Sequence, residues 1–354
     1  MRGLNIAIVL ILLFFCYAPT VLGSEPVHFE PSAPAETAMQ PASTTLALQA
    51  APSADAKPAP VSTPFSHSLS LTYSDVSGTS SVTTRFNSGR SRLDWPMDFG
   101  LVGGTYRARY REIAEWGISL QACPWTRSAQ PMKDIDMFDE SRFNGGIPVH
   151  DGIDIYSEST TDVKAFLVDL DLRVFALSSR YASMGLLLAY QAQEMDYKTY
   201  DTQQVGYGPW DDNTFNLLGP TSTYTVNYDI YTVGLTWRLK AGSRASLTVD
   251  TAFIPRATTT DEDNHLRRLR SSEIDCKGNG TRLSLNAKLA LNRNWFVSSS
   301  CSRIRISGDG TQKQHWYGDD PGTMINDTGR TISGIDAEIK QDSFHIGLSL
   351  GRTL

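Results

Sequence analysis

Two short stretches of the sequence combine acidic side chains and a histidine at a spacing of two residues. The stretch KDIDMFDESR contains Asp134 and Asp136, and the stretch TTTDEDNHLRR contains Asp263 and His265. On an extended chain, residues two apart point to the same face. A histidine oriented by an aspartate can remove a proton from water, and a facing pair of carboxylates can hold that water. Together the two stretches predict hydrolysis by an activated water molecule, if the fold places them opposite each other.

Each stretch also has a simpler interpretation. Asp-x-Asp in a polar loop usually serves turn formation or solvation. A calcium loop is the main alternative for Asp261 and Asp263, but the stretch lacks the mid-loop glycine and the distal glutamate of an EF-type loop. The basic pair Arg267–Arg268 is either a cleavage site or a loop anchor that faces anionic head groups. We expect neither a metal nor another cofactor.

The elements that must position these residues are strands, because period-two alternation recurs from Phe65 onward and no helical stripe does. The apolar faces comprise Leu69, Leu71 and Tyr73; Phe166, Val168, Leu170, Leu172 and Val174; Tyr231, Val233, Leu235, Trp237 and Leu239; and Leu283, Leu285, Ala287, Leu289 and Leu291. The opposite faces are polar, as with Asp169, Asp171 and Arg173, which we interpret as a lumen charge network. Lipid can cover the apolar faces while a polar lumen takes the charged ones. The pattern predicts an all-β, antiparallel transmembrane β-barrel.

The connections between these strands fall into two classes that alternate along the chain. Short turns are predicted at 111–115, 178–180, 240–243 and 292–294, and long outer loops at 74–89, 127–160, 200–222, 261–278 and 307–331. Short periplasmic turns and long outer loops are typical of outer-membrane barrels, and the count between them gives ten strands. The segment 184–200 is longer than the 9–11 residues that cross a membrane. We therefore expect the barrel to extend beyond the bilayer on its outer side.

Two details of the pattern need special features. In the last strand, Ile335, Ala337 and Ile339 occupy odd positions, whereas Phe344 and Ile346 occupy even ones. A β-bulge near Gln341 would reconcile the two halves. We also expect the tryptophans to lie in interfacial girdles, as is common in barrels; these are Trp95, Trp116, Trp237 and Trp295.

Composition assigns the rest of the 354-residue chain. Residues 1–23 have a basic start, an apolar run and small residues, which predicts a signal peptide. Residues 24–64 are rich in Ala, Pro, Ser and Thr, which predicts a disordered linker before a barrel domain at 65–354. The net charge of -6 argues against nucleic-acid binding. Three cysteines remain after the signal peptide, so a disulfide framework is not expected.

The sequence resembles the omptins, outer-membrane endopeptidases built on ten-stranded barrels. The resemblance runs collinearly over 65–354 and is closest in SGRSRLDW, KDIDMFDESR, YTVGLTW and TDEDNHL. It implies that Asp263 and His265 form a water-activating dyad that faces Asp134 and Asp136. It also implies that Asp261 lies at the base of a pocket for a basic substrate side chain.

Two departures from the family pattern affect specificity and activation. Family members have a second pocket acid near the first outer loop, but this chain reads SGTSSVTT there and has no acid in that stretch. In the family's cluster for lipopolysaccharide, Tyr190 matches, but Ala192 and Glu194 replace an acid and an arginine. The leading hypothesis is a monomeric outer-membrane endopeptidase that faces the exterior and cuts peptides or proteins next to basic residues, with lipopolysaccharide as an activator. The alternative is a non-catalytic barrel that acts as an adhesin or a small porin.

Overall fold

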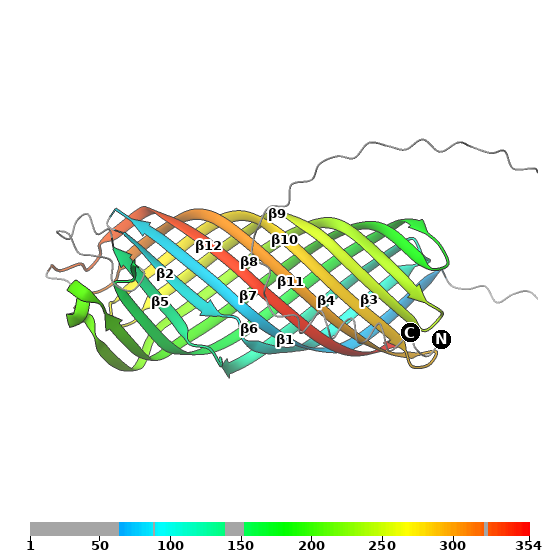
Figure 1. The fold of residues 1–354 in the computed structure, drawn as a ribbon, viewed down its shortest axis with the longest axis horizontal. Helices are drawn as coiled ribbons and strands as arrows, with labels where there is room; N and C mark the ends of the chain where they lie inside the picture. Colours follow the sequence, from blue (N-terminus) through cyan, green and yellow to red (C-terminus); the bar gives the residue numbers. More distant parts are fainter. Residues whose placement is uncertain (1–63, 88, 139–151, 322–324) are drawn as a thin grey trace, which may run out of the picture. The chain divides into compact units, whose positions relative to one another are not determined.

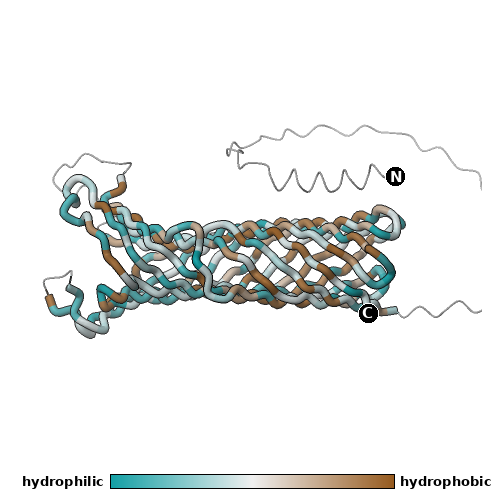
Figure 2. Tube along the Cα trace, turned by 90° about the horizontal axis from the view of Figure 1, so that it is seen from below, coloured by the Kyte–Doolittle hydropathy of each residue, from teal (hydrophilic) through white to brown (hydrophobic). Residues whose placement is uncertain are grey.

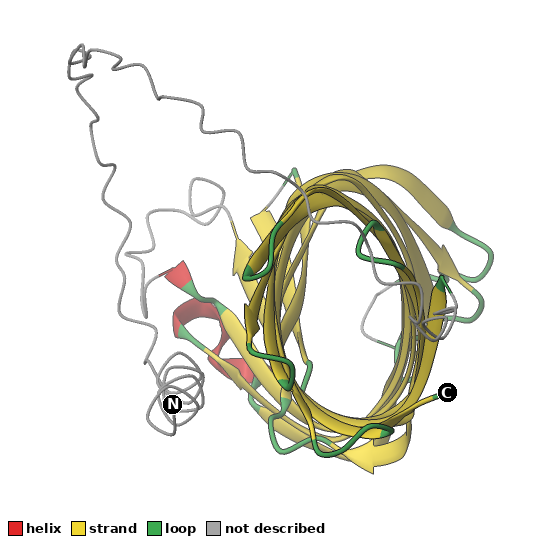
Figure 3. Ribbon diagram, turned by 90° about the vertical axis from the view of Figure 1, so that its right-hand side faces the viewer, coloured by secondary structure: helices red, strands yellow, loops and turns green. Residues whose placement is uncertain are grey.

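The strands of the chain form a single antiparallel sheet that closes into a ring (Figures 1 and 3). The structure is a computed structural model, and it describes residues 64–87, 89–138, 152–321 and 325–354. The signal peptide and nearly all of the linker prediction therefore lie outside the described residues, as does the end of KDIDMFDESR at 139–142. In the described part of the chain, no helix is long and apolar enough to cross a membrane. The predicted all-β barrel is confirmed.

The strands are long, and most exceed twenty residues. They are β1 (Phe65–Phe86), β2 (Gly89–Pro96), β3 (Phe99–Tyr110), β4 (Ala114–Arg127), β5 (Met132–Phe138), β6 (Ile155–Ser178), β7 (Ala182–Gly206), β8 (Phe215–Ala241), β9 (Ala245–His265), β10 (Arg270–Ala290), β11 (Trp295–Trp316) and β12 (Thr331–Thr353). A short 3-10 helix, η3 (Gly208–Asn213), lies between β7 and β8.

The sheet has twelve strands rather than the predicted ten, because two of the ten positions around the ring are each divided into two strands. β1 pairs with β3 along 65–76 and with β2 along 79–86, so β2 and β3 together form one neighbour of β1. β4 and β5 likewise pair with successive parts of β6. Pairing of β12 with β1 closes the ring. The split strands matter for function because β2 and β5 also pair with each other beside the predicted acid pair.

The two ends of the barrel differ. One end, here named the turn end, carries the tight connections at 111–113, 179–181, 242–244 and 291–294, close to the predicted short turns. At the other end, named the mouth, strands continue through much of what composition predicted to be loop. β1 runs to Phe86, and only 266–269 separate β9 from β10. Polar sequences can extend a barrel in water because main-chain pairing continues without lipid.

Large apolar side chains are exposed on the strands toward the turn end. Figure 2 shows hydrophobic residues, in brown, along the strands on the side of the C-terminus. The exposed set includes Leu69, Leu71, Val102, Leu120, Phe166, Leu172, Leu186, Leu188, Leu235, Phe253, Leu283, Leu289, Val297, Leu348 and Leu350. Outward apolar residues on strand after strand are what a lipid-facing belt requires.

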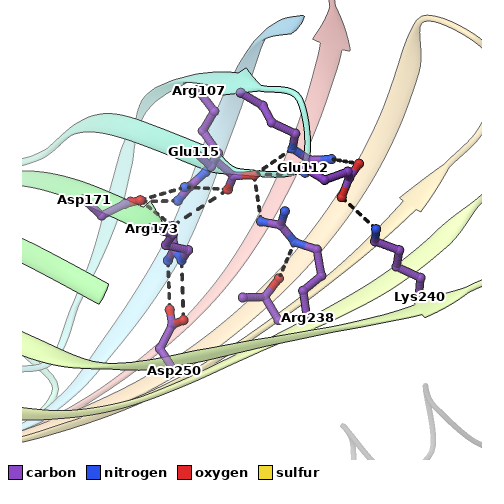
Figure 4. Close-up of polar contacts among 10 residues, drawn as sticks. Arg107, Glu112, Glu115, Asp171, Arg173, Arg238, Lys240 and Asp250 are labelled. Atoms are coloured by element: carbon purple, nitrogen blue, oxygen red, sulfur yellow. Dashed lines mark hydrogen bonds and ion pairs between the residues drawn. The ribbon is translucent and has the colours of Figure 1, made fainter. Parts of the chain in front are cut away.

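Inside the belt, buried ion pairs fill the lumen (Figure 4). Glu115 accepts hydrogen bonds from Arg238 at 2.7 Å and from Arg109 at 2.9 Å. Arg173 reaches Asp250 at 2.8 Å. Further pairs join Arg107 to Asp171 and Arg282 to Asp169. The predicted lumen charge network is therefore present, and its members come from six different strands.

An apolar layer occupies the lumen between this network and the mouth. Its buried members include Val82, Trp95, Met97, Met195, Tyr197, Tyr224, Val226, Tyr228, Ile230, Ile274, Ile304 and Ile339. Trp95 is fully buried and stacks on Tyr224 with ring centroids 4.2 Å apart. The prediction that Trp95 belongs to an interfacial girdle is wrong, because its ring fills the lumen instead. Trp116 and Trp295 do face outward and are exposed.

The predicted bulge at Gln341 is also wrong. β12 pairs with β1 in unbroken register from Asp336 to Thr353, so its side chains alternate faces without a slip. Ala337 and Ile339 point inward and are buried, whereas Leu348 points outward and is exposed. Along β12 the apolar residues shift from odd to even positions because the apolar surroundings shift from the inside of the barrel to its outside. Lipid surrounds the barrel near the turn end, and the apolar layer fills it near the mouth.

Candidate active site

The acid pair lies on β5, which joins the wall of the mouth through β2 and β6. Asp134 and Asp136 share the inward face with the buried Met132. Across the β2–β5 ladder, Leu93 stands opposite Asp134 and Ser91 opposite Asp136. The Ser91 hydroxyl donates a hydrogen bond to Asp134 Oδ1 at 3.3 Å. The split of the third ring position into β4 and β5 thus ends in a short strand that presents both carboxylates to the mouth.

The dyad lies on β9, which is separated from β5 by β6, β7 and β8. Asp261, Asp263 and His265 alternate with Glu262 and Asn264, as the spacing predicts. The two aspartates are buried and Glu262 is exposed. His265 Nε2 lies 3.0 Å from Asp263 Oδ2. The orientation of the histidine by an aspartate, expected from the sequence, is therefore present in the structure.

The fold brings the acid pair and the dyad close enough to interact. Burial raises the pKa of the Asp134 carboxyl well above its ordinary value, and the charges of Asp136 and Asp263 raise it further. Burial also raises the pKa of Asp136, while the Ser91 hydroxyl and the charges of Arg268, Arg270 and His265 oppose that rise. Like charges that share a site cannot ionise independently. The acid pair therefore retains a proton to higher pH than isolated carboxyls do.

Asp261 lies one step deeper than the dyad, at the top of the apolar layer. Its Oδ2 accepts a hydrogen bond from the Tyr224 hydroxyl at 3.0 Å, and its Oδ1 has no hydrogen-bond partner among the described residues. Burial raises the pKa of Asp261 well above the ordinary range, and the charge of Asp263 adds to this. A buried carboxylate with an unsatisfied oxygen is a suitable partner for an incoming cation.

The segment that lacks the second pocket acid, SGTSSVTT, belongs to β1. Its residue Ser80 is fully buried and shares a hydrogen bond of 2.6 Å with the Tyr228 hydroxyl. Two hydroxyls therefore occupy this part of the lumen, close to Asp261, whose charge raises the pKa of Tyr228 after the larger effect of burial. This part of the lumen thus combines one carboxylate with neutral polar groups.

The β9–β10 hairpin that follows His265 is held by specific contacts. Arg267 donates to the backbone oxygens of Leu218 at 2.8 Å and Pro220 at 3.1 Å. Arg268 forms an ion pair with Asp320 at 3.2 Å. Of the two interpretations of the basic pair, the loop anchor is the one that these contacts support for Arg267.

Sequence reasoning missed two residues that support the site. Ser91 and Tyr224 contact the predicted acids, but neither belongs to a spacing pattern that includes an acid. Tyr224 carries a detectable signal, because Tyr224, Val226 and Tyr228 alternate with polar residues in TYTVNYD. That alternation identifies a shared face, and their burial shows that the face is inward.

The third residue that the sequence did not reveal is Asp229 of β8, on the outer wall of the barrel. Tyr190 donates a hydrogen bond to Asp229 on β8, which stands directly opposite Ala192. The acid that is absent from β7 at Ala192 is thus supplied by the neighbouring strand. Nothing in the sequence of β7 alone could show this, because the pairing register is needed.

Within the ranges that the structure describes, no cluster of three or more His, Cys, Asp or Glu side chains has an arrangement that could hold a metal ion. Cys123 and Cys276 are free thiols, and both are buried.

Comparison with solved structures gives an informative likeness. No protein-family model and no curated protein matches the sequence. Among solved structures, the outer-membrane protease OmpT from Escherichia coli is similar, with a TM-score of 0.69 and 15% identity over 82% of this chain and 98% of that chain. The outer-membrane protein OprG from Pseudomonas aeruginosa has a TM-score of only 0.33 at 10% identity, over 82% of this chain and 95% of that one. The likeness to OmpT shows that the chain has the fold of an outer-membrane β-barrel.

Proposed function

We propose that this chain is an outer-membrane endopeptidase whose active site opens at the mouth, toward the cell exterior. The observation that carries the proposal is the His265–Asp263 contact at 3.0 Å, within electrostatic reach of Asp134 and Asp136. A histidine, its orienting acid and a facing acid pair are the groups needed to activate water. The likeness of the fold to an outer-membrane protease supports the same assignment.

The proposal gives each group a role in the reaction. With the Nε2 proton directed to Asp263, the Nδ1 atom of His265 is the base that removes a proton from water. Asp263 stabilises the imidazolium that results, and its burial excludes competing solvent. The shared proton of Asp134 and Asp136 lets the pair both donate to and accept from that water. The oxygen of the water then attacks the carbonyl carbon, and the imidazolium returns its proton to the leaving amine.

The buried carboxylate beneath the dyad supports a preference for a basic side chain next to the cut bond. Asp261 offers an oxygen without a partner among the described residues, while the Tyr224 hydroxyl donates to its other oxygen. The guanidinium of an arginine side chain can pair with such a carboxylate. Peptide or protein segments with basic residues are therefore the proposed substrates. Lipopolysaccharide is a proposed activator, with Tyr190 and Asp229 on the outer wall as its contacts.

Single substitutions in the dyad test the proposal. In refolded protein, His265→Ala and Asp263→Ala should lower kcat for a fluorogenic arginine peptide by about 10²- to 10⁴-fold, the contribution typical of a positioned acid or base. Glu262→Ala, on the opposite face of β9, is the matched control and should retain activity. The heat-dependent gel mobility of the barrel checks that each variant is folded. Cleavage by both dyad variants at the wild-type rate would rule out the mechanism, and strong inhibition by EDTA would point to a metal instead.

The alternative is a non-catalytic barrel that acts as an adhesin or a small porin. The lumen argues against a porin, because Glu115, Arg173, Arg238 and Asp250 of the network in Figure 4 are buried, as is the apolar layer above them. Liposome conductance and cell-binding assays, run beside the peptide assay, separate the functions. A barrel that binds cells or conducts ions but never cuts peptides would support the alternative.

A further inference from the structure

Arg270 of β10 lies beside the proposed active site but has no role in the activation of water described above. Arg270 is the first residue of β10 and stands directly opposite His265 across the β9–β10 ladder. It shares the inward face with the buried Ser272 and Ile274. Directly opposed residues of an antiparallel pair have Cβ atoms roughly 4.5–5.5 Å apart. The guanidinium therefore emerges next to the imidazole and on the same side of the sheet.

The contacts of Arg270 leave much of its hydrogen-bonding capacity unused. Its Nε atom is buried and has no hydrogen-bond partner among the described residues, and its Nη1 reaches Gln314 only at 3.5 Å. Arg270 forms no salt bridge within the described ranges, whereas Arg268 is paired with Asp320 at 3.2 Å. A buried N–H group without a partner is costly unless something else binds it.

The surroundings of Arg270 combine an aromatic ring with carboxylates that favour its charge. The Trp316 ring lies 5.8 Å from the central carbon of the guanidinium and gives it a flat packing surface. Asp263 and Asp134 both stabilise its charge, in opposition to burial and to Arg268, which lower the pKa of Arg270. The cation is thus held near the dyad and the acid pair together, although neither forms an ion pair with it.

Peptide hydrolysis requires a group of this kind. When water attacks the carbonyl carbon and passes its proton to His265, the carbonyl electron pair moves to oxygen and creates an oxyanion. The four catalytic candidates comprise three acids and a base, and none of them carries a permanent positive charge that could balance the oxyanion. We propose that Arg270 is a further catalytic residue, whose free N–H groups donate to the oxyanion of the tetrahedral intermediate. When the carbonyl re-forms and the C–N bond breaks, the imidazolium proton goes to the amine and Arg270 keeps its own.

The inference rests on the proposed peptidase function, and the experiment keeps the two separate. Full-length refolded wild type, Arg270→Gln, Arg270→Ala and Arg270→Lys are assayed with one fluorogenic arginine peptide, after gel mobility confirms folding. Arg270→Gln should lower kcat by about 10²- to 10³-fold, the loss typical when one oxyanion donor is removed, with KM little changed. Arg270→Lys should retain part of the activity. Lys313→Gln, which removes an exposed cation from β11 at a similar height, is the control and should match wild type.

Chemical rescue distinguishes catalysis from a structural role. Guanidinium at millimolar concentration should restore part of the kcat of Arg270→Ala, whereas sodium at the same ionic strength should not. A kcat of Arg270→Gln close to that of wild type would overturn the proposal. A loss confined to KM, or a loss that guanidinium cannot relieve in a folded variant, would do the same. A wild-type protein that cuts no peptide would instead remove the proposed function itself.

Discussion

The hydrogen bond from Tyr224 to Asp261 allows the proposed pocket to be tested quantitatively. Tyr224→Phe deletes a donor 3.0 Å from Asp261 Oδ2, in a carboxylate whose other oxygen has no partner in the described part of the chain. A hydrogen bond to a charged group contributes about 1.5–3 kcal/mol, which corresponds to about 10- to 150-fold in an equilibrium. Because an ionised Asp261 is needed to bind a cation, kcat/KM for an arginine peptide should fall by a factor in that range.

The assay compares an arginine peptide with one that carries citrulline, its uncharged isostere, at the same position. Citrulline does not need the charge of Asp261, so its kcat/KM should change little in Tyr224→Phe. Tyr197→Phe is the matched control, because Tyr197 is equally buried but its hydroxyl donates to the sulfur of Met195 at 3.5 Å and, among the described residues, to no carboxylate. An equal loss for both peptides, or none for arginine, would refute the role assigned to Asp261.

The raised pKa of Asp261 also predicts the direction in which the preference for arginine changes with pH. Burial raises the pKa of Asp261, so the folded protein holds that proton to higher pH than an exposed aspartate would. The preference for arginine over citrulline should therefore increase as pH rises through that pKa. In Tyr224→Phe the increase should occur at higher pH, because the lost hydrogen bond had favoured the ionised form. A pH-independent preference in both proteins would contradict this.

Three further predictions concern stability and tolerance. Asp134→Asn should raise the unfolding midpoint at neutral pH. The fold raises the pKa of Asp134, so the wild-type protein loses stability as pH rises through that pKa, whereas the asparagine variant does not. The difference in midpoint between the two proteins should therefore vanish in acid. Glu115→Gln should lower the free energy of unfolding in lipid vesicles by about 3–5 kcal/mol, because it leaves buried arginines without their partner, and an unchanged urea midpoint would contradict the proposed network. Glu262→Gln should leave kcat/KM unchanged, because Glu262 is exposed on the outer face of β9.

Alternation of residues predicted the barrel and the shared face of the site residues, because side-chain parity is a local property of any strand. Parity alone does not say which face is inside. In lipid the apolar face points outward, and nearer the mouth it points inward. Trp95 and Gln341 were misplaced for this one reason: both lie where the apolar environment has moved from the outside of the barrel to its lumen. Only the height of a residue along the barrel, which depends on register, resolves the ambiguity.

The parts of the site that escaped prediction depend on pairing between strands. Ser91 meets the acid pair only because β2 pairs with β5, and that pairing arises where two ring positions are each divided. Arg270 stands opposite His265 because the turn between β9 and β10 consists of residues 266–269 alone. A sequence records each strand separately, so contacts across a ladder require the register that folding selects.

The filled lumen has a consequence for the traffic of molecules through the protein. Glu115, Arg173 and Arg238 are nearly inaccessible to solvent at the level of the lipid belt, and the aromatic rings close the space above them. Any peptide that enters the mouth must leave by the same opening, as must both of its fragments. Departing fragments then compete with new substrate for one entrance, so product inhibition should grow with fragment length. Cleavage at this site would change what surrounds the cell without delivering anything into it.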